Sequence, residues 1–284
     1  MIRPATAGDE TTIEAFLARH ADTSMFLRSN LRAFGLHNRD DPRGTAFWVA
    51  GKGGIDAVFA LSNAGFVMSQ APNAGDETWR AFATAIAGRQ VSGITAEVSQ
   101  VRAAKLALGV TDASFALDEP EPLYRLSLET LVAPDGPGRI RPPEEADRDL
   151  IFKWTRAYSA ELHMSPPERL DEEAKGRTDR AIATGDVRLL EVQGTPVAMT
   201  AINARLPDMV QIGGVFTPPD LRGRGHARQV VAAHLVEARA EGVKTAILFA
   251  SGPAACRAYE AIGFERIGCY SLAILKNPVT LEAA

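Results

Sequence analysis

The chain has 284 residues, 46% of them hydrophobic and 23% charged, a composition typical of a globular protein. Its net charge of −4 argues against a general nucleic-acid-binding protein, and no apolar run approaches the roughly 18 residues of a membrane-spanning helix. The two cysteines and five scattered histidines show no metal-ligand spacing, so we expect no metal site. No apolar signal segment opens the chain, and we therefore expect a cytoplasmic protein without nucleic-acid or membrane partners.

The first half alternates helices and strands. Apolar residues at 3.6-residue spacing predict helices, and short apolar or alternating runs predict strands. Helices are expected over residues 10–20, 24–34, 76–88 and 101–108. Strands are expected over residues 46–50, 56–62, 65–69, 91–98, 114–117 and 123–128.

The second half has the same order of elements. Helices are expected over residues 146–163, 170–184, 228–241 and 254–262. Strands are expected over residues 139–141, 187–192, 196–204, 209–216 and 245–250, and two short strands close the chain. Mixed strands and helices in each half predict an α/β fold in which a mixed sheet is flanked by helices.

A short repeat supports a duplicated fold. The Ile-Arg-Pro start of residues 2–9 recurs in residues 140–147, and each copy ends in an Asp that can cap a helix. A Pro/Gly-rich stretch at 133–138 separates the halves. We predict two tandem domains, residues 1–132 and 139–284, joined by this linker.

A glycine-rich loop, residues 217–227, connects the predicted strand 209–216 to the helix that follows. Gly223 and Gly225 allow an anion to approach the backbone closely, and the first turn of a helix offers unpaired N–H groups. Arg222, Arg224 and Arg228 add positive charge around the same turn. The loop is either a pyrophosphate site or an ordinary connection with solvated arginines.

A second motif favours the pyrophosphate site. Residues 222–227 have the form Arg-x-x-Gly-x-Ala, and residues 259–264 have the form Tyr-x-x-x-Gly-Phe on the next predicted helix. In this order and spacing, the two motifs resemble the GNAT superfamily of acyl-CoA N-acyltransferases. The resemblance covers residues 139–276 by motif, and the first half by element order only.

The resemblance implies a site for acetyl-CoA. The strand edge would pair with the pantetheine arm where this strand splays from the next, and Gly213 and Gly214 mark a bulge site. Tyr259 would protonate the departing thiolate as a general acid. The backbone groups implied in cofactor binding belong to Val215, Phe216, Thr217, Arg222, Gly223, Arg224, Gly225, His226, Ala227 and Arg228.

The chain departs from the family pattern at two places. Gly252 stands at the cofactor-binding position where many relatives place Asn, so the expected side-chain contact to the arm is missing. The strand before the loop has no glutamate to act as a base, and the amide of Gln211 cannot take a proton. The alternatives for a base are water and four side chains, namely Glu161, His163, Glu191 and Asp208.

The first half lacks this equipment. Asp76 and Glu77 stand where the second half has arginines, and Lys105 stands in the place of Tyr259. Because carboxylates repel a pyrophosphate, we expect a degenerate copy without cofactor. We expect it to complete a shared sheet or to wall the substrate site.

The resemblance predicts direct transfer of an acetyl group from acetyl-CoA to a primary amine of a small molecule or peptide. The alternatives are another acyl donor or acceptor, and a non-catalytic acyl-CoA-binding sensor or interaction module. The acceptor and the oligomeric state stay open, with a homodimer among the alternatives.

Overall fold

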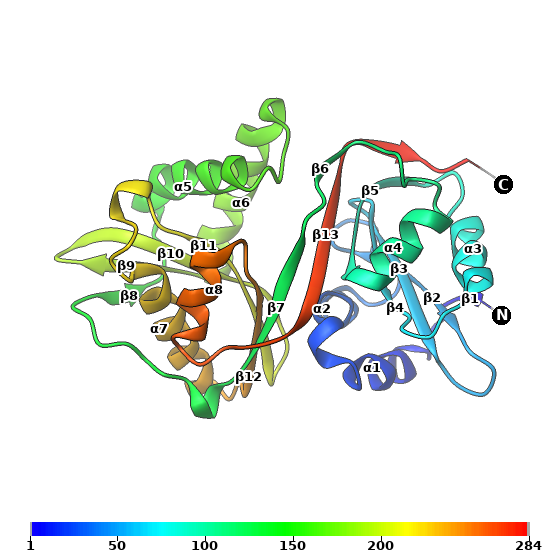
Figure 1. Ribbon diagram of the computed structural model, residues 1–284, viewed down its shortest axis with the longest axis horizontal. Helices are drawn as coiled ribbons and strands as arrows, with labels where there is room; N and C mark the ends of the chain where they lie inside the picture. Colours follow the sequence, from blue (N-terminus) through cyan, green and yellow to red (C-terminus); the bar gives the residue numbers. More distant parts are fainter. Residues whose placement is uncertain (1, 283–284) are drawn as a thin grey trace. The chain divides into compact units, whose positions relative to one another are not determined.

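The computed structural model describes residues 2–282. Its contacts divide the chain into two compact units (Figure 1). Unit 1 contains the residues up to Pro120 together with those from Cys269 onward, and unit 2 contains Glu121–Gly268. Each unit is a mixed sheet with helices on both faces, which confirms the predicted α/β fold. The boundaries of these units follow strand pairing, whereas the predicted domains 1–132 and 139–284 follow the sequence repeat.

The sheet of unit 1 has the order β1-β2-β3-β4-β5-β13, and β6 also pairs with β13. β4 and β5 run parallel, whereas the other neighbours run antiparallel. The strands are β1 (Ile2–Pro4), β2 (Thr45–Ala50), β3 (Ala57–Ser62), β4 (Phe66–Gln70), β5 (Gln90–Glu97), β6 (Phe115–Leu117) and β13 (Glu265–Thr280). The helices are α1 (Glu10–Ala18), α2 (Met25–Phe34), α3 (Asp76–Ala85) and α4 (Val98–Ala107).

Strand alternation gives unit 1 two cores. Phe47 and Val49 pack with the apolar residues of α1 and α2, whereas Trp48 and Ala50 pack with those of α3 and α4. Successive side chains of a strand point to opposite faces, so each apolar run in β2 and β3 serves both helix layers. The sheet is therefore covered on both sides.

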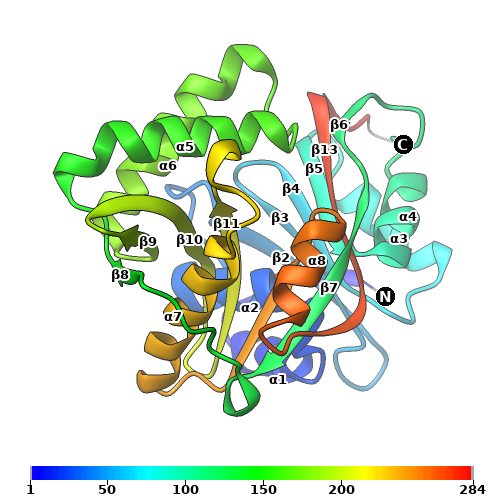
Figure 2. The ribbon, with the colours of Figure 1, turned by 60° about the vertical axis from the view of Figure 1, so that its left-hand side comes forward.

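The sheet of unit 2, read from the other end, has the order β8-β9-β10-β11-β12-β7. α5 and α6 pack on one face and α7 and α8 on the other, and β11 and β12 form the parallel pair (Figure 2). The strands are β7 (Pro120–Ser127), β8 (Arg139–Arg141), β9 (Val187–Val192), β10 (Thr195–Arg205), β11 (Met209–Phe216) and β12 (Thr245–Phe249). The helices are α5 (Arg148–Glu161), α6 (Leu170–Thr184), α7 (His226–Ala240) and α8 (Pro253–Glu260).

The two sheets have equivalent strand orders, and the last place in each is filled by the other half of the chain. β13, from the end of the chain, lies beside β5 in unit 1. β7, which precedes the 133–138 linker, lies beside β12 in unit 2. The first half of the sequence thus supplies one strand of the sheet that carries the glycine-rich loop.

The repeated Ile-Arg-Pro segments make the same Arg–Asp pair in both units. Arg3 donates to both carboxylate oxygens of Asp9 at 2.7 and 2.8 Å. Arg141 donates in the same way to Asp147 at 2.6 and 2.9 Å. Each bidentate pair fastens a first strand to the start of the following helix, and such pairs are geometrically specific. The sequence repeat is therefore a structural repeat.

The end of the chain differs from the prediction. Two short strands were expected, and this expectation is wrong, because β13 is a single strand of 16 residues. Its pairing with β5 shifts register between Ile274 and Val279, around Pro278, and continues beyond it. Pro278 has no N–H to donate, and a register shift accommodates it without ending the strand.

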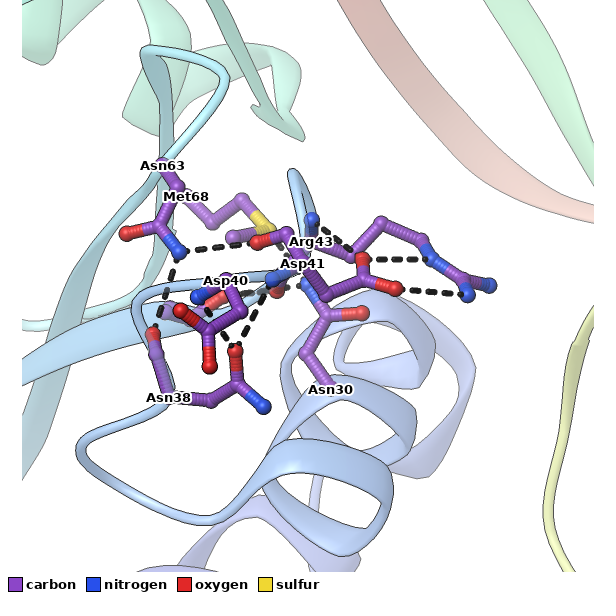
Figure 3. A network of polar contacts seen from close by, with 8 residues as sticks. Asn30, Asn38, Asp40, Asp41, Arg43, Asn63 and Met68 are labelled. Atoms are coloured by element: carbon purple, nitrogen blue, oxygen red, sulfur yellow. Dashed lines mark hydrogen bonds and ion pairs between the residues drawn. The ribbon is translucent and has the colours of Figure 1, made fainter. Parts of the chain in front are cut away.

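Side-chain amides hold the connection between α2 and β2 in unit 1 (Figure 3). Asn63 Nδ2 donates to the backbone oxygens of Asn38 and Asp41 at 3.0 and 2.8 Å. Asn38 Oδ1 accepts from the backbone N–H groups of Asp40 and Asp41 at 2.9 and 3.0 Å. These bonds satisfy loop backbone that has no place in the sheet, so the network fixes the start of β2.

Within the described residues, no helix is both long enough and apolar enough to span a bilayer.

Candidate functional site

β11 and β12 part before β11 ends. Their parallel register runs from Met209 opposite Thr245 to Ile212 opposite Leu248. On its other side, β11 stays paired with β10 as far as Phe216. Residues 213–216 therefore have strand register on one side only, and their outward backbone groups are open to another hydrogen-bonding chain. β12 itself ends at Phe249, so the open edge begins where β12 stops, and the splay of the two strands stays a prediction.

A bulge bends β11 where the strands part. Between the pairs Met199–Phe216 and Ala201–Gly213, β10 advances two residues and β11 three. Gly214 adopts φ 57°, a conformation that favours glycine. A Cβ on Gly213 would lie 1.9 Å from Asn203 Nδ2. Gly214 is thus required by its backbone conformation, whereas the exposed Asn203 side chain can move away from a Cβ at Gly213, and the register shift confirms the predicted bulge site.

The glycine-rich loop leads into an uncapped helix. Gly223 and Gly225 adopt φ 77° and 83°, and Gly225 is the N-cap of α7 without any side-chain cap bond. The first turn of α7 contains no acidic residue. Its N–H groups and the positive end of its dipole are therefore available to an anion. Burial, and then the charge of Arg224, lower the pKa of His226 in this turn, which favours its neutral form.

The arginines of the loop have different roles. Arg222 donates from Nε to the backbone oxygen of Thr217 at 2.9 Å, and from Nη1 and Nη2 to Glu161 at 2.9 and 2.6 Å. This bidentate pair ties the loop to the end of α5. Arg224 Nη2 donates to the backbone oxygen of Asp220 at 3.2 Å within the loop itself. Arg222 is therefore a loop anchor, and part of its charge is neutralised by Glu161.

Tyr259 lies on α8 with 7% of its surface exposed. Burial raises its pKa, and the neighbouring Tyr158, Glu121 and Cys256 raise it further. The phenol is thus a neutral acid at physiological pH. Tyr124 on β7 donates its hydroxyl to Glu260 at 2.6 Å and so links β7 to the end of the same helix.

Gly252 is the N-cap of α8, with φ 94° and ψ 170°. This region of backbone conformation is open essentially to glycine alone. The absence of an asparagine side chain at this position therefore has a local structural reason.

The four candidate bases lie in unlike environments. Glu191 is buried, and its hydrogen bonds to Arg141 and Arg139 lower its pKa and hold it as an anion. Asp208 precedes β11, at the opposite end of an eight-residue strand from the loop, roughly 25 Å away at strand rise. Glu161 is paired with Arg222, and His163 follows α5 with φ 52°.

Glu121 is a side chain that the sequence did not single out. It lies on β7, more than 130 residues before Tyr259, yet its charge acts on the pKa of both Tyr158 and Tyr259. Tyr158 comes from α5 and packs against a cluster that includes Phe216 of β11. No local motif marks Glu121, because only the pairing of β7 with β12 brings it here.

Residues 148–264 match the model of the Acetyltransferase (GNAT) family. These residues are a GNAT-family domain. The matched residues include helices α5 to α8, the glycine-rich loop and Tyr259. The match places this domain among the acyltransferases. A comparison with curated proteins gives no match.

Solved structures share the fold over both units. A Drosophila protein is 15% identical with a TM-score of 0.65, and the alignment covers 97% of this chain and 99% of that one. For a GCN5-related N-acetyltransferase from Kribbella flavida the values are 18%, 0.57, 92% and 95%. For a tandem GNAT protein from the clavulanic acid biosynthesis pathway they are 15%, 0.53, 98% and 99%. At these identities the likeness shows the fold, which is a tandem of two GNAT-like domains.

Among the described residues, no group of three or more His, Cys, Asp or Glu side chains is placed to hold a metal ion.

Proposed function

We propose that unit 2 transfers an acetyl group from acetyl-CoA to a primary amine of a small molecule or peptide. The observation that carries the proposal is the one-sided edge of residues 213–216, which runs directly into the uncapped N-terminus of α7. An extended chain with amide groups can pair with that edge, and a pyrophosphate suits that helix end. The carrier of an activated acyl group, CoA, combines these two chemical features.

The residues of the loop fit such a ligand. A Cβ at Gly223 would meet no heavy atom within 4 Å, and α7 has no acid in its first turn. Backbone N–H groups from Arg222 to Arg228 hold the pyrophosphate in this proposal, with Arg224 and Arg228 adding charge. The backbone from Val215 to Thr217 pairs with the arm. When bound, acetyl-CoA supplies a thioester that an amine can attack directly.

Tyr259 acts as the general acid in this proposal. Its neutral phenol donates a proton to the thiolate as the carbon–sulfur bond breaks. A backbone N–H of the parted strand hydrogen-bonds the thioester carbonyl and stabilises the negative charge that develops there. Burial of Tyr259 supports the role in one respect, because it keeps the phenol protonated before the thiolate forms.

Thiol release from acetyl-CoA, measured with a panel of small and peptide amines, tests the proposal. We expect amine-dependent release of free CoA together with thermal stabilisation by acetyl-CoA, since a ligand that binds only the folded state raises its stability. Propionyl-CoA and larger acyl-CoAs in the same assay decide whether the donor is acetyl-CoA. An absence of both release and stabilisation contradicts the proposal.

Gly252 favours one second candidate, an acyl-CoA-binding sensor without turnover. It provides no side chain to position the arm, and a poorly positioned thioester slows transfer while the pyrophosphate site can still bind the ligand. Stabilisation by acetyl-CoA with no thiol release across hydroxyl, thiol and amine acceptors identifies this function. Release with any of them identifies an enzyme.

A further inference from the structure

The pairing of β7 places Glu121 at the end of the sheet where β11 and β12 part. The antiparallel register of β7 and β12 ends with Leu123 opposite Phe249, and Ala250 then donates to the backbone oxygen of Pro122 at 3.1 Å. Glu121 is therefore just beyond the carboxyl end of β12. Because β11 and β12 are parallel, this is also the end at which β11 leads into the glycine-rich loop.

Alternation along β7 gives the face of the sheet. Tyr124 and Leu126 belong to the core that includes the apolar residues of α7 and α8. Successive side chains on a strand point to opposite faces, so Glu121 and Leu123 belong to the face that α5 and α6 cover. The side chain of Tyr158 comes to that face from α5. Glu121 and Tyr259 thus approach the parted strands from opposite faces.

Glu121 is a half-buried carboxylate without a charged partner. Within the described part of the chain, no hydrogen bond or ion pair involves its side chain, whereas the buried Glu191 is held by two arginines. Burial raises the pKa of Glu121. Its charge, after burial, raises the pKa of Tyr158 and contributes to the raised pKa of Tyr259, so the carboxylate lies near both phenols.

A half-buried and unpaired carboxylate costs folding free energy, and such groups concentrate at functional sites. Three elements contribute residues to the surroundings of Glu121, namely β7, α5 and α8. A purely structural carboxylate at this place would have a cation beside it, as Glu191 and Asp147 do. Glu121 lies on the opposite face of the open strand edge from Tyr259, the proposed acid. This position suits a group that takes a proton.

We propose that Glu121 is the general base that takes the proton of the acceptor ammonium, so that the free amine can attack the thioester. The inference rests on the proposed acetyl transfer. The carboxylate accepts one proton from the ammonium, the new nitrogen–carbon bond forms, and the carbon–sulfur bond breaks. Tyr259 gives its proton to the thiolate and regains one from the acylated nitrogen, and Glu121 returns its proton to water. The net products are the amide, CoA thiol and one proton.

Glu121→Gln in the full chain tests the base. We expect kcat/KM for the amine to fall roughly 10²- to 10⁴-fold, with unchanged affinity for acetyl-CoA by calorimetry. The wild-type pH profile should have an acidic limb above the usual glutamate range, and this limb should disappear in the variant. The profile is measured with two amines of different basicity. A limb that comes from the amine shifts with the pKa of the amine, whereas a limb that comes from Glu121 stays in place. Glu121→Asp keeps the carboxylate and should keep the limb at a lower rate.

Glu121 acts on the phenols of Tyr158 and Tyr259, and two further groups act on the same phenols, Arg177 of α6 on Tyr158 and Cys256 of α8 on Tyr259. Carbon-13 NMR of glutamate-labelled protein follows the titration of the Glu121 carboxyl without any turnover, and comparison with Glu121→Gln assigns its signal. We expect it to titrate above the exposed glutamates. Glu119→Gln, at an exposed position two residues away, is the matched control and should change neither measurement.

The possible results distinguish failure of the general base from failure of the proposed acetyl transfer. Turnover by Glu121→Gln within about twofold of the wild type at every pH overturns the base and leaves the proposed acetyl transfer intact. Titration of Glu121 together with the exposed glutamates also overturns the base in an active enzyme. A wild-type protein that releases no CoA with any acceptor overturns the transfer and the base together.

Discussion

Units 1 and 2 have the same sheet order, and they differ at the carboxyl end of the parallel strand pair. In unit 2, β11 runs beyond its register with β12 and leaves residues 213–216 open on that side. In unit 1, the backbone N–H of Ala71, just after β4, donates at 2.7 Å to the buried side chain of Gln100. The side-chain oxygen of Gln70 accepts from Thr23 and Ser24 at 2.8 and 3.1 Å. Unit 1 thus fills with its own side chains what unit 2 leaves open.

The helices that follow the two parallel strands differ in charge. Gly75 is the N-cap of α3, and Asp76 and Glu77 occupy its first turn. The equivalent turn of α7 has no acid and lies among arginines. Negative side chains stabilise a helix N-terminus by themselves, so α3 needs no ligand and would repel a phosphate. The comparison teaches that one fold can be completed by its own side chains or can leave a strand edge and a helix end without such partners.

Gly225→Glu should have the largest effect, because it gives α7 the kind of acid that α3 already has. A side chain at φ 83° is strained, its Cβ would lie 3.2 Å from Arg228 Nε, and its charge would repel the pyrophosphate. We expect a loss of roughly a hundredfold or more in acetyl-CoA affinity, measured by calorimetry. Gly75→Glu, at the equivalent N-cap of α3, is the control and should leave the affinity unchanged. Normal affinity in Gly225→Glu contradicts the pyrophosphate site.

Tyr259→Phe should lower kcat roughly 10²- to 10⁴-fold with little change in acetyl-CoA affinity. Since burial raises the pKa of Tyr259, its neutral form persists above the ordinary phenol range, and this residue should cause no fall in kcat below about pH 10. Stopped assays of thiol release across pH check both statements.

Lys105→Met is the matched control in unit 1. Lys105 stands in the place of Tyr259 and is paired with Asp118, with Nζ 4.1 Å from the ring centroid of Phe115. We expect turnover to be unchanged in this variant. If Tyr259→Phe also turns over normally, the phenol has no part in the mechanism.

Gln100→Met should destabilise unit 1 without touching the site of unit 2. It removes the acceptor of the Ala71 N–H, and an unsatisfied buried N–H costs about 1–3 kcal/mol. Urea unfolding followed by circular dichroism measures the loss, and acetyl-CoA affinity should stay the same. Gln90→Met, an exposed position on β5, is the control and should be near neutral. A neutral Gln100→Met would show that water satisfies Ala71, and that unit 1 is not sealed by this side chain.

Glu161→Gln should have the smallest effect. The pair of Glu161 with Arg222 is about half exposed, with side-chain exposures of 49% and 43%, and such pairs contribute about 0–1 kcal/mol. We expect a change in stability below about 1 kcal/mol and a change in KM for acetyl-CoA below about fivefold. Glu241→Gln, in the exposed pair with Arg205, is the control. A large rise in KM in Glu161→Gln alone would make the loop anchor essential to binding.

Local chemistry made most elements and half of the site predictable. Short sequence segments contain all the features that were predicted, namely the Ile-Arg-Pro repeat, the glycines that adopt positive φ, the arginines around α7 and the motif containing Tyr259. Backbone strain, helix-end charge and hydrophobic periodicity act over the same short distances. The sequence by itself therefore determined two GNAT-like halves, a single glycine-rich loop and the motif that contains Tyr259.

Strand pairing decided the rest. Nothing local in β7 or β13 says which sheet each will join, because an extended strand is specified by its partner's edge as much as by its own residues. Only the tertiary structure shows that β7 joins the sheet of unit 2 and β13 that of unit 1. It also pairs Glu161 with Arg222 and Gln100 with the backbone after β4. Finally, it places Glu121, from the first half of the chain, where its charge acts on Tyr259.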